Sequence, residues 1–295
     1  MSEINAASVK QLRDLTGLGM MECKKALQES GGDLKKAEDL LRIKSGSKAT
    51  KVAGRVAAEG AVGIHVNSDK SIGVLVEVNC ETDFVGKDAG FRDFVDVVAK
   101  TACENKTNTV EDLLQKTIDG ETIESIRQKL VMKLGENMAI RRVVLVQAKG
   151  ELSFYLHGTK IGVIVDLEGG DSALGKDLSM HVAAMKPIAV SEAQVPSETL
   201  EREREIARGR ALESGKPQEI IDKIVEGSIR KYLSEVTLLG QSFVKDDKQS
   251  VASLVNSNSA EVHSFKMFVV GEGIEKKVSD FAAEVEAQAA SRGIK

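Results

Sequence analysis

Residues Ile72–Asp88 read IGVLVEVNCETDFVGKD, and residues Ile161–Asp177 read IGVIVDLEGGDSALGKD. The two stretches align without a gap at a constant offset of 89 residues, and 7 of their 17 positions are identical. In both copies a β-rich segment and a short turn come before, and an apolar segment with helical spacing follows. The repeat therefore predicts a core made of two copies of a hairpin plus a helix, which places the chain in the α+β class.

The segments around the repeat complete this expected core. Apolar side chains at helical spacing follow both copies: Phe91, Phe94, Val95 and Val98 after the first, and Leu178, Val182 and Met185 after the second. Between the copies we expect helical residues over 109–139 and a strand over 142–148. A further strand is expected over 262–270.

The N-terminal region, residues 8–42, has the pattern of three short helices. Ser8 and Gln11 have the spacing of a capping box, and Gly17 ends the first helix. Gly31-Gly32 ends the second helix, and Asp33 is placed to cap the third. We expect Val9, Leu12 and Leu15 on the apolar face of the first helix. Residues 43–56 are basic and small, which fits a linker or a weak helix.

The pattern returns to a helical period between Ser197 and Val236. A strongly charged segment, a turn at Gly215-Lys216-Pro217 and an apolar-periodic return segment predict an antiparallel helical hairpin that projects from the core. The hairpin's charges are most simply a solvated helix surface. An amphipathic C-terminal helix is then expected from the apolar spacing of Ile274, Val278, Phe281 and Val285.

These patterns divide the chain into successive regions. We expect a helical bundle over 1–43, a linker over 44–56, core subdomain N over 57–140, the first part of core subdomain C over 141–190, the inserted helical hairpin over 191–239, the return of core subdomain C over 240–270 and a C-terminal helical module over 271–295.

The composition excludes several classes of function. The 295 residues carry a net charge of −4 and are only 3% aromatic, with no Trp. That argues against a base-stacking binder of single-stranded nucleic acid, and against electrostatic binding to nucleic acid or to an anionic membrane. The three cysteines are far apart, the N-terminus lacks a signal-peptide pattern, and no apolar run reaches a membrane span. We therefore expect a cytoplasmic protein.

The sequence offers poor candidates for catalysis. Gly170–Asp177 almost matches a phosphate-binding loop, but Asp177 stands where a hydroxyl would ligate magnesium. The first copy has the same Gly-Lys-Asp turn, so a helix entry capped by aspartate is the simpler interpretation. The four histidines are dispersed without metal-ligand spacing: His65, His157, His181 and His263. We expect no catalytic residue, no metal site and no cofactor.

The two repeat copies differ most in one loop. Where the second copy has Asp171-Ser-Ala-Leu174, the first has Thr82-Asp83-Phe84-Val85. Phe84 could turn back into the core, or it could project as a wedge that enters a partner's pocket, with Asp83 adding negative charge.

Two adjacent methionines offer a second candidate surface. Met20 and Met21 cannot both face the core of a small helix bundle unless the helix start is bent. We therefore expect one of them to be exposed, and methionine is common on binding surfaces.

Two stretches of the sequence resemble the signatures of a known protein family. The stretch Leu15-Thr16-Gly17-x-Gly19-Met20-Met21-x-Cys23-Lys24-Lys25-Ala26-Leu27 is similar to the N-terminal signature of the bacterial translation elongation factor Ts family, and Glu77-Val-Asn79-x-Glu81-Thr82-Asp83-Phe84-Val85 to its second signature. The ending Gly271-Glu-Gly-Ile274-Glu-Lys is also typical. The resemblance covers nearly the whole chain.

The resemblance implies a fold and a function. It implies a ubiquitin-associated-like N-terminal bundle, two related core subdomains, an inserted hairpin and a C-terminal helical module. The implied activity is guanine nucleotide exchange on the GTPase elongation factor Tu, without nucleotide binding by the chain itself. Thr82, Asp83, Phe84 and Val85 would lie against the partner's magnesium and phosphate site. Met20 and Met21 would contact its GTPase domain.

Two other classes of function stay open from the residues alone. An adaptor could bind a ubiquitin-like partner through the N-terminal bundle, and a phosphate-loop enzyme could bind nucleotide at Gly170–Asp177. Neither accounts for the difference between the repeat copies. The hairpin could mediate self-association, touch the partner or be neutral.

Overall fold

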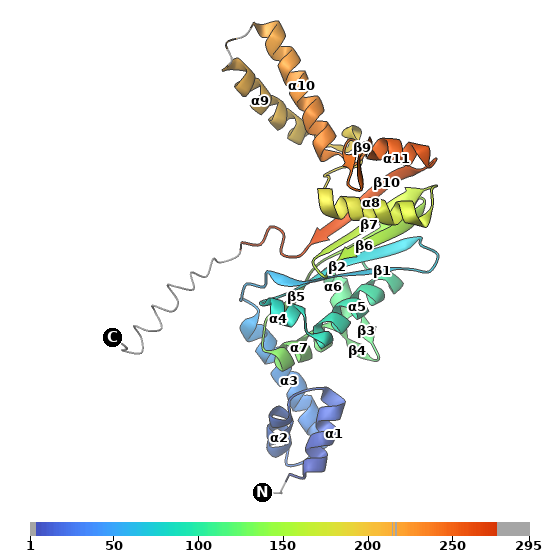
Figure 1. The fold of residues 1–295 in the computed structure, drawn as a ribbon. Helices are drawn as coiled ribbons and strands as arrows, with labels where there is room; N and C mark the ends of the chain where they lie inside the picture. The colour runs from blue at the N-terminus through green and yellow to red at the C-terminus, as the bar shows by residue number, and fades with distance from the viewer. Residues whose placement is uncertain (1–3, 214, 216, 276–295) are drawn as a thin grey trace, which may run out of the picture.

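The computed structural model describes residues 4–213, 215 and 217–275. The molecule is elongated and of mixed α+β class (Figure 1), with helices at its N-terminal end, two three-stranded antiparallel sheets in the middle and a pair of helices at the opposite end. Within these residues no helix has both the length and the apolar character needed to cross a membrane.

The N-terminal helices are α1 (Ala6–Thr16), α2 (Met20–Glu29) and α3 (Leu34–Val52). Gly17 adopts a left-handed backbone with φ 67°, which ends α1, and Asp33 caps α3 as expected. The capping box at Ser8 and Gln11 is wrong. The helix begins two residues before Ser8, because the side chain of Asn5 already accepts the N–H of Ala7. The prediction that Leu15 lies on the apolar face of this helix is also wrong, because 61% of the residue is exposed.

Of the two alternatives for residues 43–56, a linker or a weak helix, the structure shows a helix up to Val52, which continues α3. The buried residues of α3 are Ala37, Leu41, Ser45, Ala49 and Val52. Their spacing keeps them on one face of a single long helix. The basic residues that suggested a linker lie between these positions, so they do not interrupt the buried face.

The first sheet has the strand order β1-β2-β5, and helix α5 covers one of its faces. The strands are β1 (Glu59–Val66), β2 (Ile72–Cys80) and β5 (Met138–Gln147), and the helices and short strands between them are α4 (Asp83–Gly86), α5 (Ala89–Glu104), α6 (Val110–Gln115), β3 (Thr117–Ile118), β4 (Glu121–Thr122) and α7 (Ile123–Leu134). The expected helical region over 109–139 is therefore two helices separated by a small hairpin.

The second sheet has the order β10-β7-β6, with helix α8 on one face. Its elements are β6 (Glu151–His157), β7 (Ile161–Glu168), α8 (Ser172–Met185) and β10 (Glu261–Val269), joined through η1 (Glu192–Gln194), β8 (Ser242–Phe243), β9 (Asp246–Ser250) and α11 (Val251–Ser257). Asp88 caps α5, as expected. Asp177 does not cap α8, because Asp171 accepts the N–H of Leu174 and starts that helix earlier.

The glycine shared by the two repeat copies lies where the sheets pack together. A methyl group at Gly73 would lie 2.9 Å from Leu152 Cδ1, and one at Gly162 would lie 2.5 Å from Val62 Cγ1. Each glycine thus meets a side chain from the opposite sheet. The apolar layer between the sheets is built from Val62, Leu75, Val146, Leu152 and Ile164. The absence of a side chain at these two glycines permits this close approach.

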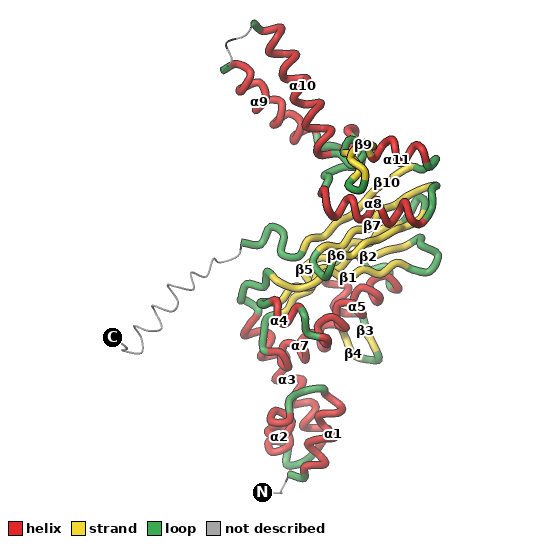
Figure 2. Tube along the Cα trace, in the orientation of Figure 1, coloured by secondary structure: helices red, strands yellow, loops and turns green. Residues whose placement is uncertain are grey.

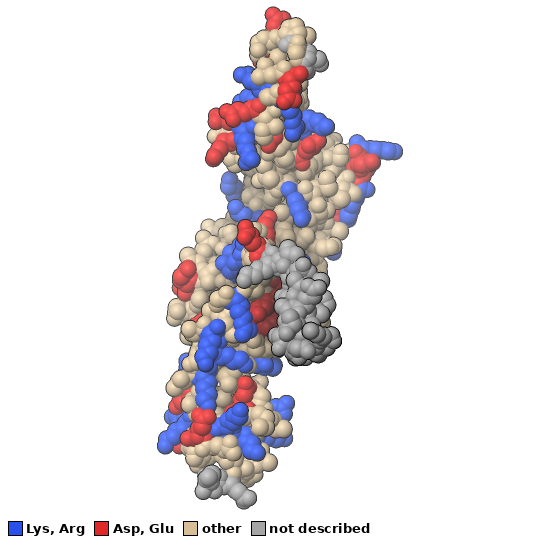
Figure 3. All heavy atoms as spheres, turned by 90° about the vertical axis from the view of Figure 1, so that its left-hand side faces the viewer, with Lys and Arg blue, Asp and Glu red and all other residues tan. Residues whose placement is uncertain are grey.

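The expected hairpin consists of α9 (Ser197–Leu212) and α10 (Gln218–Val236), which pack against each other and project away from the sheets (Figure 2). Ile221, Val225, Ile229 and Leu233 form its buried stripe. Acidic and basic side chains alternate over this end of the molecule (Figure 3), as on a solvated helix surface. Beyond β10, residues 271–275 form turn and coil. The rest of the expected C-terminal helix lies outside the described residues.

Replacing Gly162 with alanine tests the packing between the sheets. The added methyl group overpacks the interface against Val62, so we expect Gly162→Ala to lower the free energy of unfolding by about 1–3 kcal/mol in urea titrations followed by circular dichroism. Gly227 in α10 has open space around it, so Gly227→Ala is the control and should raise stability by up to about 1 kcal/mol. Equal stability of the two variants would contradict the close approach.

Candidate functional site

Phe84 projects from the molecule, and 80% of it is exposed. It lies in α4, a single helical turn directly after the central strand β2. Val85 and Gly86 are buried beneath this turn, and a methyl group at Gly86 would lie 3.4 Å from the carbonyl oxygen of Gly60. Because Val85 takes the inward position, the preceding side chain points outward. The alternative in which Phe84 packs into the core is therefore wrong.

The start of this turn is clamped by Glu136. Its carboxylate accepts hydrogen bonds from the backbone N–H of Thr82 at 3.0 Å and from the Thr82 hydroxyl at 2.6 Å. Immediately before, Glu81 accepts the N–H of Asn137 at 2.6 Å, and the Asn137 amide donates to the carbonyl of Arg55 at 2.8 Å. The loop is thus tied to the start of β5 and to the chain that follows α3.

Asp83 presents a charged group beside Phe84. Its Oδ2 lies 2.6 Å from Lys87 Nζ, one helical turn later, and the Asp83 side chain is about half exposed. The hydrogen bond from Lys87 and the positive charge of that side chain lower the pKa of Asp83 below its usual value. The exposed end of the loop therefore combines an apolar ring with an ionised carboxylate.

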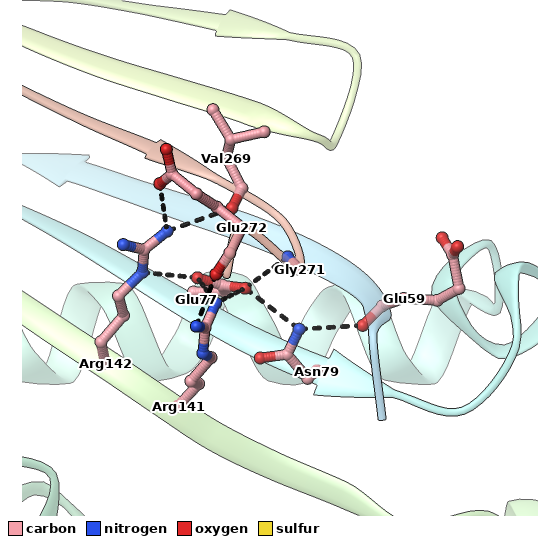
Figure 4. Close-up of polar contacts among 8 residues, drawn as sticks. All are labelled: Glu59, Glu77, Asn79, Arg141, Arg142, Val269, Gly271 and Glu272. Carbon is pink, nitrogen blue, oxygen red and sulfur yellow. Dashed lines mark hydrogen bonds and ion pairs between the residues drawn. The ribbon is translucent and has the colours of Figure 1, made fainter. Parts of the chain in front are cut away.

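Strand β2, which carries this loop, is anchored through a buried carboxylate (Figure 4). Glu77 is fully buried; it accepts the N–H of Gly271 at 2.8 Å and the Asn79 amide at 3.0 Å, and it pairs with Arg141 and Arg142. Burial alone would raise the pKa of Glu77, but the bonds from Gly271, Asn79 and Arg142 lower it. Arg141 also donates to the carbonyl of Glu272 at 2.6 Å.

The repeat places a second buried carboxylate at the matching position of β7. Asp166 is 2% exposed, and it accepts the N–H groups of Lys149 and Gly150, each at 3.0 Å. Lys149 and Gly150 follow β5 of the first sheet, whereas Gly271 follows β10 of the second. Glu77 therefore holds the chain that leaves β10 of the opposite sheet, whereas Asp166 holds the connection from β5 of the opposite sheet to β6, its neighbour in its own sheet.

Met20 and Met21 are both exposed, at 58% and 64%, although we expected only one to be. Helix α2 turns Cys23, Ala26 and Leu27 inward, so its first turn faces outward. The methionines begin helix α2 and Phe84 lies in α4, and the junction of α3 and α7 lies between these two helices (Figure 1). The two predicted surfaces belong to separate parts of the molecule.

Two of the remaining candidates, His181 and Asp177, have structural partners. His181 is fully buried: its Nδ1 accepts the N–H of Val244 at 3.1 Å, so its Nε2 donates to Gln241 at 2.9 Å. Desolvation lowers the pKa of His181, which keeps it neutral. In the phosphate-loop candidate, Asp177 pairs with Lys245 at 2.6 Å. Across the part of the chain that the structure describes, no group of three or more His, Cys, Asp or Glu residues could hold a metal ion.

Sequence reasoning missed the residues that support the loop. Glu136 and Asn137 lie more than fifty residues after Thr82, outside both signatures, and a Gly-Glu-Asn turn has no feature that announces a partner. Arg141 and Arg142 looked like ordinary polar positions of a strand. The only signal was indirect, since Glu77 and Asp166 share a position in the repeat.

Comparison with known proteins gives consistent matches along the chain. A family profile described as elongation factor TS matches residues 81–272. The chain is 57% identical over 289 residues to elongation factor Ts of Nitrosomonas eutropha, covering 98% of each chain. It is 56% identical over 292 residues to that of Nitrosospira multiformis, covering 98% of this chain and 97% of the relative. With elongation factor Ts of an Azoarcus species it shares 51% identity over 296 residues and the full length of both.

Removing the Glu136 carboxylate should loosen the loop. In Glu136→Ala the backbone N–H and hydroxyl of Thr82 lose their acceptor, so we expect amide hydrogen exchange over residues 82–87 to become about tenfold faster, while exchange in α5 is unchanged. The matched control is Glu111→Ala, which removes an exposed carboxylate on α6. Unchanged protection of residues 82–87 in Glu136→Ala would show that the clamp does not order the turn.

Proposed function

The chain belongs to the elongation factor Ts family, whose members are nucleotide exchange factors for elongation factor Tu in translation elongation, and we propose that it drives GDP release through the wedge formed by Thr82, Asp83, Phe84 and Val85. It is a non-enzymatic factor, so its effect on the GTPase partner comes from binding alone. Because translation elongation takes place in the bacterial cytoplasm, the protein acts there.

The free energy that holds the nucleotide on the GTPase determines how much the wedge must contribute. A nucleotide bound at nanomolar affinity is held by about 12 kcal/mol, much of it through phosphate and magnesium. An exchange factor must bind the nucleotide-free GTPase better than the nucleotide-bound form, and the nucleotide then weakens the factor by the same ratio. A swing from 1:99 to 99:1 requires about 5.5 kcal/mol of differential affinity.

The observation that carries this proposal is the exposure of Phe84 on a clamped turn. An exposed ring gains about 1.5–3 kcal/mol when a partner buries it. The clamp from Glu136 keeps the turn ordered before binding, so little ordering entropy opposes that gain. We infer that Phe84 displaces a segment of the GTPase beside its magnesium site, and that the ionised Asp83 disfavours the phosphate-bound state there.

Phe84 alone supplies less than the required difference, so other contacts must hold the complex. The exposed Met20 and Met21 supply a second apolar surface, which we assign to docking on the GTPase domain. We further infer that the N-terminal helices form a ubiquitin-associated-like bundle. The two sheets, each with its covering helix, we interpret as a duplicated unit into which the hairpin α9–α10 is inserted.

Removing the ring should separate exchange from docking. In Phe84→Ala we expect the maximal rate of labelled GDP release from elongation factor Tu, with magnesium present, to fall at least tenfold, while the affinity for the nucleotide-free GTPase falls by a smaller factor. Phe84→Leu should retain an intermediate rate. Leu212→Ala, which truncates an exposed apolar side chain on the hairpin, is the surface control. An equal loss of rate and affinity would reject the wedge. Tight GDP binding by the chain alone would favour the phosphate-loop alternative.

Replacing both methionines should weaken docking while the maximal rate of GDP release stays nearly unchanged, the reverse of the effect expected for Phe84→Ala. The double variant Met20→Ser, Met21→Ser removes apolar area from the docking surface but leaves the wedge intact. We expect the concentration for half-maximal acceleration of GDP release to rise about tenfold or more, with the rate at saturation within twofold of the parent protein. A lower saturating rate at unchanged affinity would show that these side chains do not act in docking.

A further inference from the structure

Helix α3 is shared by two hydrophobic cores. Its first buried residues, Ala37 and Leu41, belong to the core of the N-terminal helices. Its last ones, Ala49 and Val52, belong to the core beneath the first sheet. All of them lie on the same helical face. A helix of this length spans about 28 Å at 1.5 Å per residue, so α3 is a continuous strut between the two cores.

Met132 of helix α7 completes the core of the N-terminal helices. It is 6% exposed and packs in one cluster with Val9, Leu12, Leu27 and Leu41, although its own helix belongs to the first sheet. Ser45, at the middle of the α3 stripe, is 1% exposed, and its hydroxyl lies 3.0 Å from Met132 Sδ. The side chain of Met132 thus extends from α7 into the core of the N-terminal helices. It does so beside Ser45, between the α3 residues that belong to that core and those that belong to the core beneath the first sheet.

Two further contacts hold α3 to the same segment of α7. Lys48 Nζ donates to the carbonyl oxygen of Met132 at 2.8 Å. A methyl group at Gly46 would lie 3.2 Å from Gln128 Oε1, so the two helices approach closely there. These contacts fix the rotation of α3 about its own axis relative to α7.

The other side of the junction is open. An apolar groove of about 360 Å³ lies between the turn at Gly17 and Leu18 and the helices α5 and α7. The N-terminal helices are therefore not packed against the core on that side. Without the contacts at Met132, the N-terminal helices could therefore tilt into this groove.

We propose that Met132 is a positioning residue, which fixes the N-terminal helices so that Met20, Met21 and Phe84 reach the GTPase as one rigid surface. The proposal rests on the docking and wedge roles assigned above. When two contact elements sit on one rigid body, binding of the first brings the second to its site without a further ordering cost. A loosened junction loses this advantage but leaves the wedge itself unchanged.

The experiment uses the full-length chain with spin labels on both sides of the junction. The native cysteines Cys23, Cys80 and Cys103 are all buried, so cysteines introduced at the exposed positions Lys10 and Lys100 can be labelled selectively. Distance distributions from pulsed electron resonance are compared for the parent protein, Met132→Ala and Met132→Leu. Each variant is also assayed for GDP release from elongation factor Tu over a range of concentrations.

We expect a narrow distribution in the parent protein, a clearly broader one in Met132→Ala and a narrow one in Met132→Leu, which refills the apolar site. The concentration for half-maximal acceleration should rise about tenfold in Met132→Ala, with the saturating rate within twofold of the parent. Lys48→Met removes only the donor to the Met132 carbonyl and should give a smaller shift in the same direction. If Met132→Ala fails to fold, Lys48→Met provides the test of the junction in its place.

A broad distribution in the parent protein, or a narrow one in a folded Met132→Ala, would overturn the proposal. Broadening without a rise in the half-maximal concentration would overturn it as well. The variant with both methionines replaced then identifies the cause. If that variant also docks normally, the assigned docking role has failed; if it docks poorly, only the requirement for a rigid junction has failed.

Discussion

A buried carboxylate at one position of each central strand holds the two sheets together. Glu77 and Asp166 occupy equivalent places in the repeat, and each accepts backbone N–H groups from the chain that leaves an edge strand of the opposite sheet. Removing a carboxylate from water costs several kcal/mol unless its oxygens are fully bonded. Each acidic residue is therefore stable only where those donors are delivered: Glu77 ties the end of β10 to the first sheet, and Asp166 ties the β5–β6 connection to the second.

The position of the wedge follows from this constraint. Strand β2 carries Glu77 in its middle and leads directly into the turn that holds Phe84. Because β2 is anchored to the second sheet on one side and clamped through Glu136 at its end, the turn projects from a rigid base. A flexible loop would lose ordering entropy on binding, whereas this turn is already in place. The strand that the two repeat copies share thus supports the turn in which they differ.

The sequence predicted the elements whose information is local. The internal repeat located β2 and β7, helical spacing located α5 and α8, and the difference between the repeat copies located Phe84. It left open whether residues 43–56 form a linker or a weak helix, because the buried stripe of α3 passes there through Ser45 and Ala49, which are small residues. It could not predict Glu136 or Met132. Their roles depend on contacts with residues more than fifty positions away, and long-range contacts leave no period in a sequence.

The charge beside the ring bears on how the proposed wedge would act. Asp83 is already paired with Lys87 within the same turn, so the loop presents little net charge to an approaching partner. An exposed pair of this spacing contributes only about 0.3–0.5 kcal/mol, so it can open at small cost when the partner's surface is met. We therefore infer that entry of the loop depends on burial of the Phe84 ring, which salt does not screen as it screens charge interactions, and that the carboxylate acts only after the ring has entered. In the proposed wedge, the ring of Phe84 therefore acts before the carboxylate of Asp83, while docking of the whole molecule depends on contacts outside this turn.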